Sequence, residues 1–234
     1  MSVSSSEDKM TGMTEQPRVR DMTLDDVDGV VEVHRHCFPA SVSIFSVLNC
    51  NIVKRYYELF VKEPESLGAV LVEPETGRVG GFAAGTLKPG IQKRFAVRYF
   101  FPLCWNVFFG CLTSAAIRRV VFAHLKAIPE MFIEKKGKKF AEAEGSPPDG
   151  PIGFFMPIAL HPDFRGGGNA VKLADYLTNK FFERGVARIR GGGITIENIA
   201  SRRLFEEKLG WNSKVISDKW VAVWIDRAQY KTKK

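Results

Sequence analysis

Residues 154–170 read FFMPIALHPDFRGGGNA, an apolar run followed by a glycine-rich turn. The run Phe154–Leu160 is predicted to be a strand, and the turn Arg165–Ala170 is predicted to open a helix that continues to about Glu183. Apolar residues recur three or four positions apart, the spacing of one helix face; they are Val171, Ala174, Leu177 and Phe181. Gly185 then ends the helix, as a glycine just beyond a helix C-terminus commonly does.

The glycine turn has the composition of an anion-binding site. Without Cβ atoms, its backbone N–H groups can approach a ligand closely. The first N–H groups of a helix have no intrahelical partner, and the helix dipole favours an anion there. A strand, a glycine turn and a helix N-terminus together indicate a phosphate or pyrophosphate site. The alternative is a turn that only reverses the chain, because the run has neither the P-loop nor the Rossmann fingerprint.

Three positions in the turn, Arg165, Gly168 and Ala170, match the acyl-CoA signature of the GNAT superfamily of N-acyltransferases. That signature is Gln or Arg, two residues, Gly, one residue, then Gly or Ala. Residues Asn198–Trp211 resemble the Asn-to-Gly-aromatic segment of the same family. Both halves occur in the right order and separation, so the chain resembles this family over about a quarter of its length.

The resemblance implies an α/β fold. Its central sheet is mixed but mostly antiparallel, its fourth and fifth strands are splayed, helices flank it, and a helical insertion is added. It also implies acetyl-CoA as cofactor, with the pantetheine arm in the gap between the splayed strands. The implied reaction is transfer of an acetyl or other acyl group to a primary amine by direct attack in a ternary complex, without a covalent enzyme intermediate.

The resemblance also assigns cofactor contacts. Backbone groups of Ile158 and Leu160 would bond pantetheine as an added strand does. Amides of the glycine turn, with Arg165, would hold the pyrophosphate, and Asn198 matches a cofactor-contacting Asn. The implied cofactor-binding residues are Ile158, Leu160, Arg165, Gly166, Gly167, Gly168, Asn169, Ala170, Asn198 and Phe205.

The residues for proton transfer are less well defined. Pro157 has no N–H, so Ile158 is the candidate backbone donor to the thioester oxygen. The family commonly has Tyr where this chain has Phe205, and Phe cannot protonate a leaving thiolate. Glu197 is the candidate general base; weaker candidates are Glu32, His36 and His161. A degenerate member that binds acyl-CoA as a regulatory or membrane-recruited module is therefore the alternative to an enzyme.

The rest of the chain is read as one domain, residues 17–226, with an insertion at 91–150. A disordered tail is expected at 1–16 and a frayed basic tail at 227–234. Thr23 and Asp26 predict a capping box before the first helix. The other predicted elements are a strand at 17–22, a helix at 41–62, a strand hairpin at 68–72 and 79–87, a strand at 187–196 interrupted by glycines, and closing strands at 214–217 and 219–225.

The insertion has an unusual composition. Tyr99–Ile117 carries no charge and is rich in aromatic residues, while basic residues stand on both sides of it. Its length approaches the roughly 20 residues of a membrane span. Polar, Gly and Pro residues interrupt it, however, and a span would put the two ends of one small domain on opposite sides of the bilayer. Two readings remain: a helical pair packed on the core or on a partner chain such as a second copy, or a peripheral membrane patch over residues 93–139.

Composition narrows the partners. The net charge of +8 favours anionic ligands without singling out nucleic acid. The basic residues cluster in the insertion and predict no basic groove with stacking aromatics, so no nucleic-acid partner is expected. Four cysteines without metal-ligand spacing indicate reduced thiols in a cytoplasmic protein and no metal. The acceptor is expected to be a small-molecule amine, with an amino sugar, a nucleotide-linked sugar and a peptide as candidates.

Overall fold

The computed structural model describes residues 16–40, 43–115, 117–122 and 140–231. The tail expected at 1–16 lies outside these ranges except for Gln16, and so does the basic run at 135–139.

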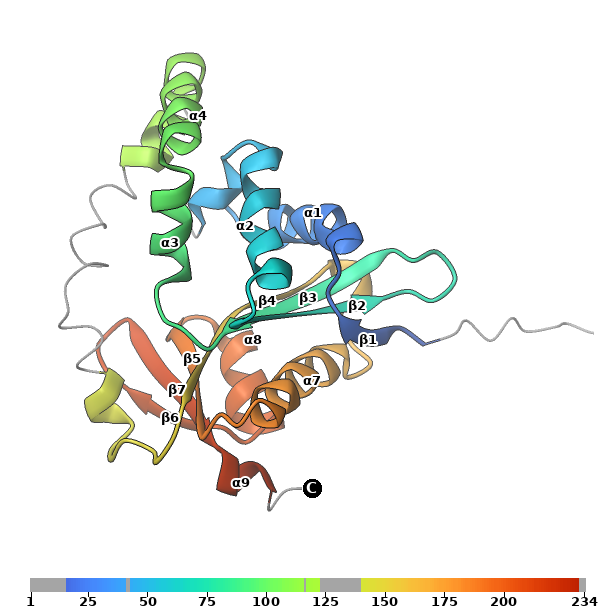
Figure 1. Ribbon diagram of the computed structural model, residues 1–234, viewed down its shortest axis with the longest axis vertical. Helices are drawn as coiled ribbons and strands as arrows, with labels where there is room; N and C mark the ends of the chain where they lie inside the picture. Colours follow the sequence, from blue (N-terminus) through green and yellow to red (C-terminus); the bar gives the residue numbers. More distant parts are fainter. Residues whose placement is uncertain (1–15, 41–42, 116, 123–139, 232–234) are drawn as a thin grey trace, which may run out of the picture.

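A seven-stranded sheet forms the centre of the protein (Figure 1). Its strands are β1 (Arg18–Asp21), β2 (Ser66–Val72), β3 (Val79–Thr86), β4 (Ile152–Leu160), β5 (Arg188–Thr195), β6 (Asn212–Val215) and β7 (Trp220–Asp226). The spatial order is β1-β2-β3-β4-β5-β7-β6, and every neighbouring pair is antiparallel except β4 and β5. The expected mixed, mostly antiparallel sheet is confirmed.

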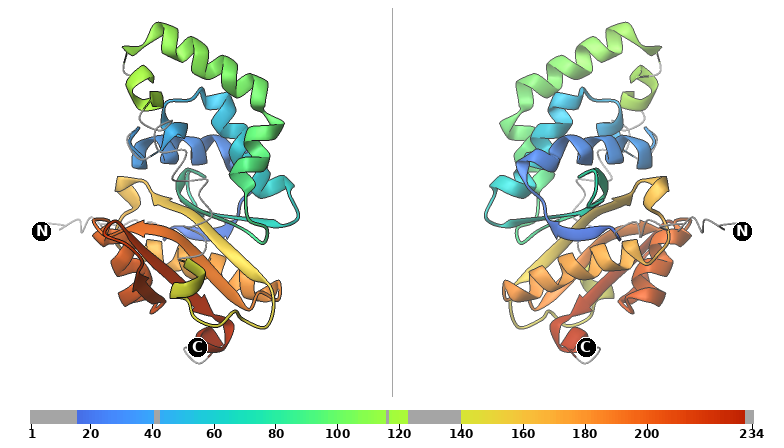
Figure 2. Two further views of the ribbon diagram at one scale, coloured as in Figure 1. Left: turned by 90° about the vertical axis from the view of Figure 1, so that its left-hand side faces the viewer. Right: turned by 90° about the vertical axis from the view of Figure 1, so that its right-hand side faces the viewer.

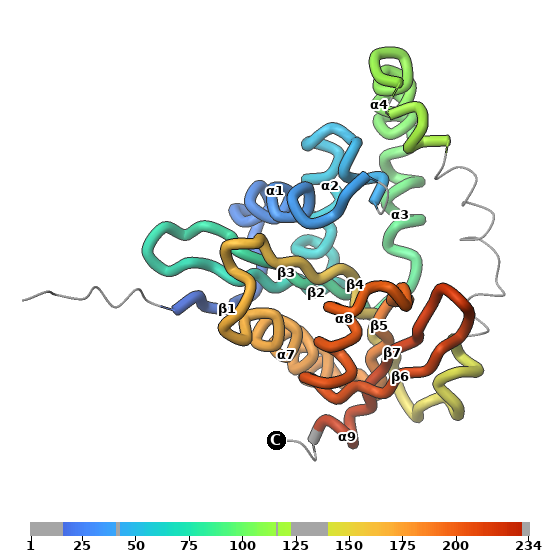
Figure 3. Tube along the Cα trace, turned by 180° about the vertical axis from the view of Figure 1, so that it is seen from behind, coloured from blue at the N-terminus to red at the C-terminus, as the bar shows by residue number. Residues whose placement is uncertain are grey.

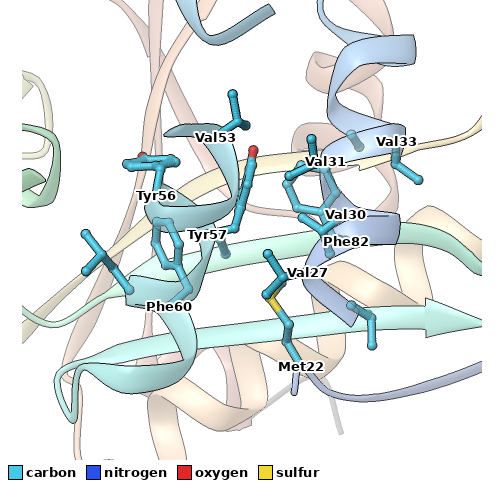
Figure 4. Packing of buried hydrophobic residues seen from close by; sticks show 14 of the residues in the cluster. Met22, Val27, Val30, Val31, Val33, Val53, Tyr56, Tyr57, Phe60 and Phe82 are labelled. Atoms are coloured by element: carbon cyan, nitrogen blue, oxygen red, sulfur yellow. The ribbon is translucent and has the colours of Figure 1, made fainter. Parts of the chain in front are cut away.

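Helices cover both faces of the sheet. Figure 1 and the view from behind in Figure 3 show α1 (Val27–Cys37) and α2 (Cys50–Lys62) on one face and α7 (Asn169–Glu183) on the other. Each face has its own buried cluster. In the first cluster, Tyr56, Tyr57 and Phe60 of α2 pack with valines of α1 and with Phe82 of β3 (Figure 4). Burial of these apolar faces is the main force that holds the helices on the sheet.

Local side-chain chemistry sets where α1 and α2 begin. The predicted capping box is present: an Asp26 carboxylate oxygen accepts the Thr23 backbone N–H at 2.8 Å, just before α1. The helix predicted from residue 41, however, begins only at Cys50, after a short 3₁₀ turn η2 (Ile44–Ser46). Asn49 causes the late start, because its side-chain oxygen accepts the N–H of Asn51 at 2.9 Å and caps the helix.

Strands β4 and β5 diverge after a short parallel pairing. They are paired only from Ile152 and Arg188 to Phe155 and Gly191. A bulge follows on β4, where Met156 and Pro157 stand opposite the single residue Ala84 of β3. Proline tolerates this position because a bulge residue makes no ladder hydrogen bond. Beyond the bulge, β4 remains paired with β3 and leaves β5.

On β5, the glycine run 191–193 coincides with a register shift against β7 between Gly191 and Ile194. The interruption of this strand at its glycines is therefore a bulge, and the strand pairs with β7 on both sides of it.

The insertion begins with two helices, α3 (Ile91–Arg98) and α4 (Phe100–Thr113), which break at Tyr99. No single described helix is long and apolar enough to cross a membrane; α3 and α4 pass that test of length and composition only as a pair, and they are bent by 81°. The return segment is tied to the sheet by buried charges. Arg190 donates to the buried Glu144 carboxylate at 2.6 Å, and Arg188 donates to the carbonyls of Glu144 and Ser146 at 3.2 Å.

The C-terminal segment differs from the expected frayed tail. Residues Arg227–Lys231 form helix α9. The Tyr230 ring packs on Phe182 at 4.9 Å between centroids, and its hydroxyl donates to Asp175 of α7 at 2.8 Å. These contacts come from residues distant in sequence, which the basic composition of the segment did not reveal.

Candidate functional site

The end of β4 presents free backbone groups to the gap beside β5. The N–H of His161 donates to the carbonyl of Gly80 at 2.9 Å, which makes these two residues a hydrogen-bonded pair. Such pairs alternate along antiparallel strands. By the register, Ile158 and Leu160 are therefore the residues whose N–H and C=O groups point away from β3. The Leu160 carbonyl accepts instead from the Cys37 thiol at 3.1 Å.

The glycine turn follows directly and leads into α7. Gly166, Gly167 and Gly168 all have positive φ, at 99°, 57° and 75°, a conformation that side-chain-bearing residues rarely adopt. A Cβ on Gly166 or Gly168 would meet no atom within 4 Å, so the turn is open on its outer side. The Asn169 side chain holds the turn in shape by donating to the buried Phe164 carbonyl at 3.1 Å.

The second wall of the gap comes from the segment after β5. The Asn198 side chain accepts the Ser201 N–H at 3.1 Å and caps α8 (Ile199–Arg202). The helix then widens into a π-helical turn, η4 (Arg203–Lys208). Such wide turns are rare and occur often at functional sites. The segment ends at Gly210, whose positive φ of 61° is typical of a glycine just beyond a helix C-terminus.

These elements enclose a cleft of about 560 Å³. Its lining includes the outward-facing part of β4, the glycine turn, the start of α7, the end of α1 and the α8–η4 segment. The cationic side chains in the lining are Arg165, Arg203 and Lys208, and none of the described lining residues is a carboxylate. A positive cleft with open backbone amides suits a ligand that carries phosphates.

Comparison with known proteins agrees with this geometry. The sequence profile described as the Acetyltransferase (GNAT) family matches residues 122–211, which include β4, the glycine turn, α7, β5 and the α8–η4 segment. The profile covers 90 of the 234 residues and supports membership of the GNAT superfamily. The family uses acetyl-CoA or CoA as cosubstrate, and membership supports acyl transfer in general. No curated protein matches the chain at a significant level.

Solved GNAT structures share the fold at low sequence identity. The yncA protein of Salmonella typhimurium, solved with its cofactor acetyl-CoA, is 14% identical, with a TM-score of 0.54 over 91% of this chain and 94% of its own. The GNAT domain of S. lividans PAT is 15% identical, with a TM-score of 0.52 over 90% of each chain. An N-acetyltransferase of Staphylococcus aureus Mu50 is 14% identical, with a TM-score of 0.53 over 91% of this chain and 99% of its own.

Most residues assigned to the cofactor by the GNAT resemblance meet in this cleft. The lining contains Ile158, Leu160, Arg165, Gly166, Gly168, Asn169, Ala170 and Asn198. Gly167 belongs to the same turn but is not among the lining residues. Phe205 does not line the cleft either: it is 5% exposed and packs between Phe155 and Trp211, with ring centroids 5.4 and 4.8 Å away.

The predicted acid and base groups lie elsewhere. Glu197 is exposed in the turn before α8 and does not line the cleft. Glu32 and His36 share the outer surface of α1, where the His36 ring lies 4.5 Å from that of His161. His161 itself is buried beside Asp163, whose carboxylate lies 3.2 Å from the His161 Nδ1. The structure therefore groups Glu32, His36 and His161 near one another, leaves Glu197 on a different segment, and places none of the four in the lining of the cleft.

The structure adds cleft residues that the sequence did not indicate. Cys37 and Phe38 come from the end of α1, more than 100 residues before β4, and no local pattern links them to the glycine turn. Ser201, Arg203 and Lys208 fall inside the segment that resembles the family. The positive charges of Arg203 and Lys208, which follow Asn198 in this segment, were the available indication that it lines an anion-binding cleft. Burial raises the pKa of the Cys37 thiol, and Arg165 only partly offsets this, so the thiol stays protonated near neutral pH.

Proposed function

We propose that the protein is an N-acetyltransferase that transfers the acetyl group of acetyl-CoA to a primary amine by direct attack in a ternary complex. The observation that carries the proposal is the backbone edge of β4 beyond Phe155, which is not paired with β5. The N–H and C=O groups of Ile158 and Leu160 face the gap beside β5, in the same cleft as the glycine turn. An extended ligand can bond to such an edge as an added strand does.

The phosphate end of the cosubstrate fits the other end of the cleft. The N–H groups of Ala170 and Val171 are in the first turn of α7, where no intrahelical acceptor is available. Arg165 stands before them, and Arg203 and Lys208 face them from η4. These donors and charges would hold the diphosphate and the further phosphate of CoA.

The reacting end would use backbone groups. Acetyl-CoA supplies an activated thioester carbonyl when it is bound. The Ile158 N–H is the donor available to polarise that oxygen, because the preceding Pro157 has none. Phe205 is buried and has no hydroxyl, so it cannot protonate the departing sulfur. Glu197 is exposed near the open end of β5, where it would act on the amine through water.

Calorimetric titration with acetyl-CoA and CoA tests the cosubstrate assignment. We expect micromolar binding by the native protein and its loss, by at least about 100-fold, in Gly168→Glu, because the added carboxylate repels phosphate and fills the turn. Gly77→Glu is the matched control: Gly77 has a similar positive φ of 71° and open space around it, but it lies in the β2–β3 loop. Unchanged affinity for acetyl-CoA and CoA in Gly168→Glu would contradict the assignment of the glycine turn as the pyrophosphate site.

Acetyl transfer is tested separately by release of free CoA thiol with a panel of amines that includes an amino sugar, small amines and a peptide.

The second candidate function is an acyl-CoA-binding module without catalysis. The buried, hydroxyl-free Phe205 and the absence of a carboxylate among the described lining residues favour it. Tight binding without amine-dependent thiol release across the panel would support the module, and amine-dependent release would support the enzyme.

A further inference from the structure

Helix α4 has apolar residues on two opposite faces. Its inward residues Leu103 and Val107 pack on the first core cluster. Its outward residues are three or four positions apart and are exposed; they are Phe101, Cys104, Trp105, Phe108 and Leu112. The exposed fractions of Phe101 and Trp105 are 81% and 68%. The described part of the chain therefore leaves this outward face uncovered, and a helix that is apolar all round requires a second apolar environment.

The outward face of α4 stands where a flat surface can reach it. Figures 1 and 2 show α4 at the end of the molecule opposite the C-terminus, beyond α1 and α2. A shallow hollow of about 800 Å³ lies on it, lined by Phe101, Pro102, Cys104, Trp105 and Phe108. Contiguous apolar patches of this kind on a protein surface mark sites of interaction with proteins or membranes.

Basic residues stand at both ends of this apolar face. Between residues 88 and 122 the chain has six Lys or Arg residues and no Asp or Glu. Arg98 precedes the first turn of α4 and is exposed. At the other end, Arg118 donates to the carbonyl of Cys111 at 2.6 Å, and Arg119 beside it is exposed. An apolar centre with a cationic rim is complementary to lipid tails beneath anionic head groups.

We propose that α4 is a peripheral membrane anchor whose outward face enters the interface of an anionic phospholipid bilayer. A span is disfavoured because α3 is fixed in the protein by the buried Ile91 and Phe95, and because the 14 residues of α4 cover about 21 Å, less than the roughly 30 Å hydrocarbon core. A second copy is disfavoured because a two-fold contact through α4 would bring the cationic rims of both copies together. The proposal does not depend on the proposed acetyltransferase activity.

Sedimentation of the full-length protein with vesicles tests the proposal. We expect binding to vesicles of phosphatidylcholine with phosphatidylglycerol and much weaker binding to phosphatidylcholine alone.

The double variant F101S/W105S should lower the partition coefficient at least about tenfold, because two side chains no longer enter the interface. Arg119→Glu should lower binding to the anionic vesicles about fivefold or more. Val215→Ser is the control, since Val215 is an apolar residue on β6 that is 61% exposed, and the variant should bind as the native protein does.

Two further measurements show whether Trp105 itself enters the bilayer and whether the variants remain folded. The fluorescence of Trp105 should shift to shorter wavelength with anionic vesicles, and Trp105→Phe should abolish the shift although the other three tryptophans remain. Thermal unfolding verifies that the exposed substitutions leave the protein folded. Failure to sediment with either vesicle, or equal sedimentation of F101S/W105S and the native protein, would overturn the proposal. So would a dimer in analytical ultracentrifugation that Phe101→Ser dissociates, because a second copy would then cover the patch.

Discussion

Helices α7 and α4 have almost the same length, 15 and 14 residues, but they bury their side chains in opposite ways. α7 buries one stripe almost completely; the stripe includes Leu173, Ala174, Leu177 and Phe181. Among the described residues of α4, none is fully buried. α7 thus belongs to the interior of the domain, whereas α4 rests on the domain through one face only.

This difference in burial determines which kind of ligand or partner each helix can bind. Because α7 is held along its length, its N-terminus is a fixed point at which the glycine turn can present amides to a phosphate. α4 packs on the first core cluster through the partly buried Leu103 and Val107, and its outer face remains available to a partner. The strongest test of this contrast is to truncate one aromatic side chain on each helix.

Phe181→Ala is expected to show the largest effect. The Phe181 ring fills space above two strand glycines: a Cβ on Gly85 would lie 2.3 Å from its Cζ, and one on Gly153 would lie 2.6 Å from its Cδ1. Truncation leaves a cavity that these strands cannot close, so the free energy of unfolding should fall by about 3–5 kcal/mol. Urea denaturation at pH 7 measures this change.

The matched substitution on α4 is Phe108→Ala, at an exposed position of the outward face. It should change the free energy of unfolding by no more than about 0.5 kcal/mol. A loss comparable to that of Phe181→Ala would mean that the outward face of α4 is covered in solution, and the contrast between the two helices would be broken.

Sequence reasoning succeeded where local chemistry decides the structure. The span of α7, the positive φ of Gly185, the Asn198 cap and the Thr23–Asp26 capping box all follow from residues within a few positions of one another. The core strands were also predicted from short apolar runs, which suit strands such as β2 and β3 that are buried on both faces.

Contacts between distant segments were beyond that reasoning. Nothing near Cys37 in the sequence shows that its thiol reaches the Leu160 carbonyl, 123 residues away. The burial of Phe205 depends on Phe155 and Trp211, and the helix α9 depends on contacts with α7. In α4, apolar residues on every side predicted a helix but could not show which face turns inward.

The contrast between buried and exposed faces recurs on α1, where it gives a pH-dependent prediction. His34 is buried, with its ring nitrogens 2.6 Å from the Tyr57 hydroxyl and 3.2 Å from the Ser43 hydroxyl. Burial, with a smaller contribution from Arg35, lowers the pKa of His34 from 6.5 to about 4. The unfolded chain therefore binds the proton more readily, and the contribution of His34 to stability is present above pH 6.5 and is lost as the pH falls toward 4.

The loss amounts to roughly 3 kcal/mol in the free energy of unfolding by pH 4. Urea denaturation across this pH range measures it, with His34→Gln as the variant that should show a shallower slope. His36→Gln, at an exposed position two residues further along α1, is the matched control variant. An equal slope in His34→Gln and the native protein would place the pH dependence in another group.

A small effect is also expected for a hydrogen bond that joins α4 to the rest of the domain. The Asn106 side-chain oxygen accepts the backbone N–H of Asn49 at 3.0 Å, at the residue that caps α2. Because this N–H is exposed, water can replace the lost acceptor in Asn106→Ala, and unfolding should become easier by only about 0.5–1 kcal/mol. Asn49→Ala removes the cap itself and should cost about 1 kcal/mol or more. If instead Asn106→Ala lowers the free energy of unfolding more than Asn49→Ala does, the attachment of α4 to the core contributes more to stability than the α2 cap. The contrast between α4 and α7 would then be weaker than the exposure of their side chains indicates.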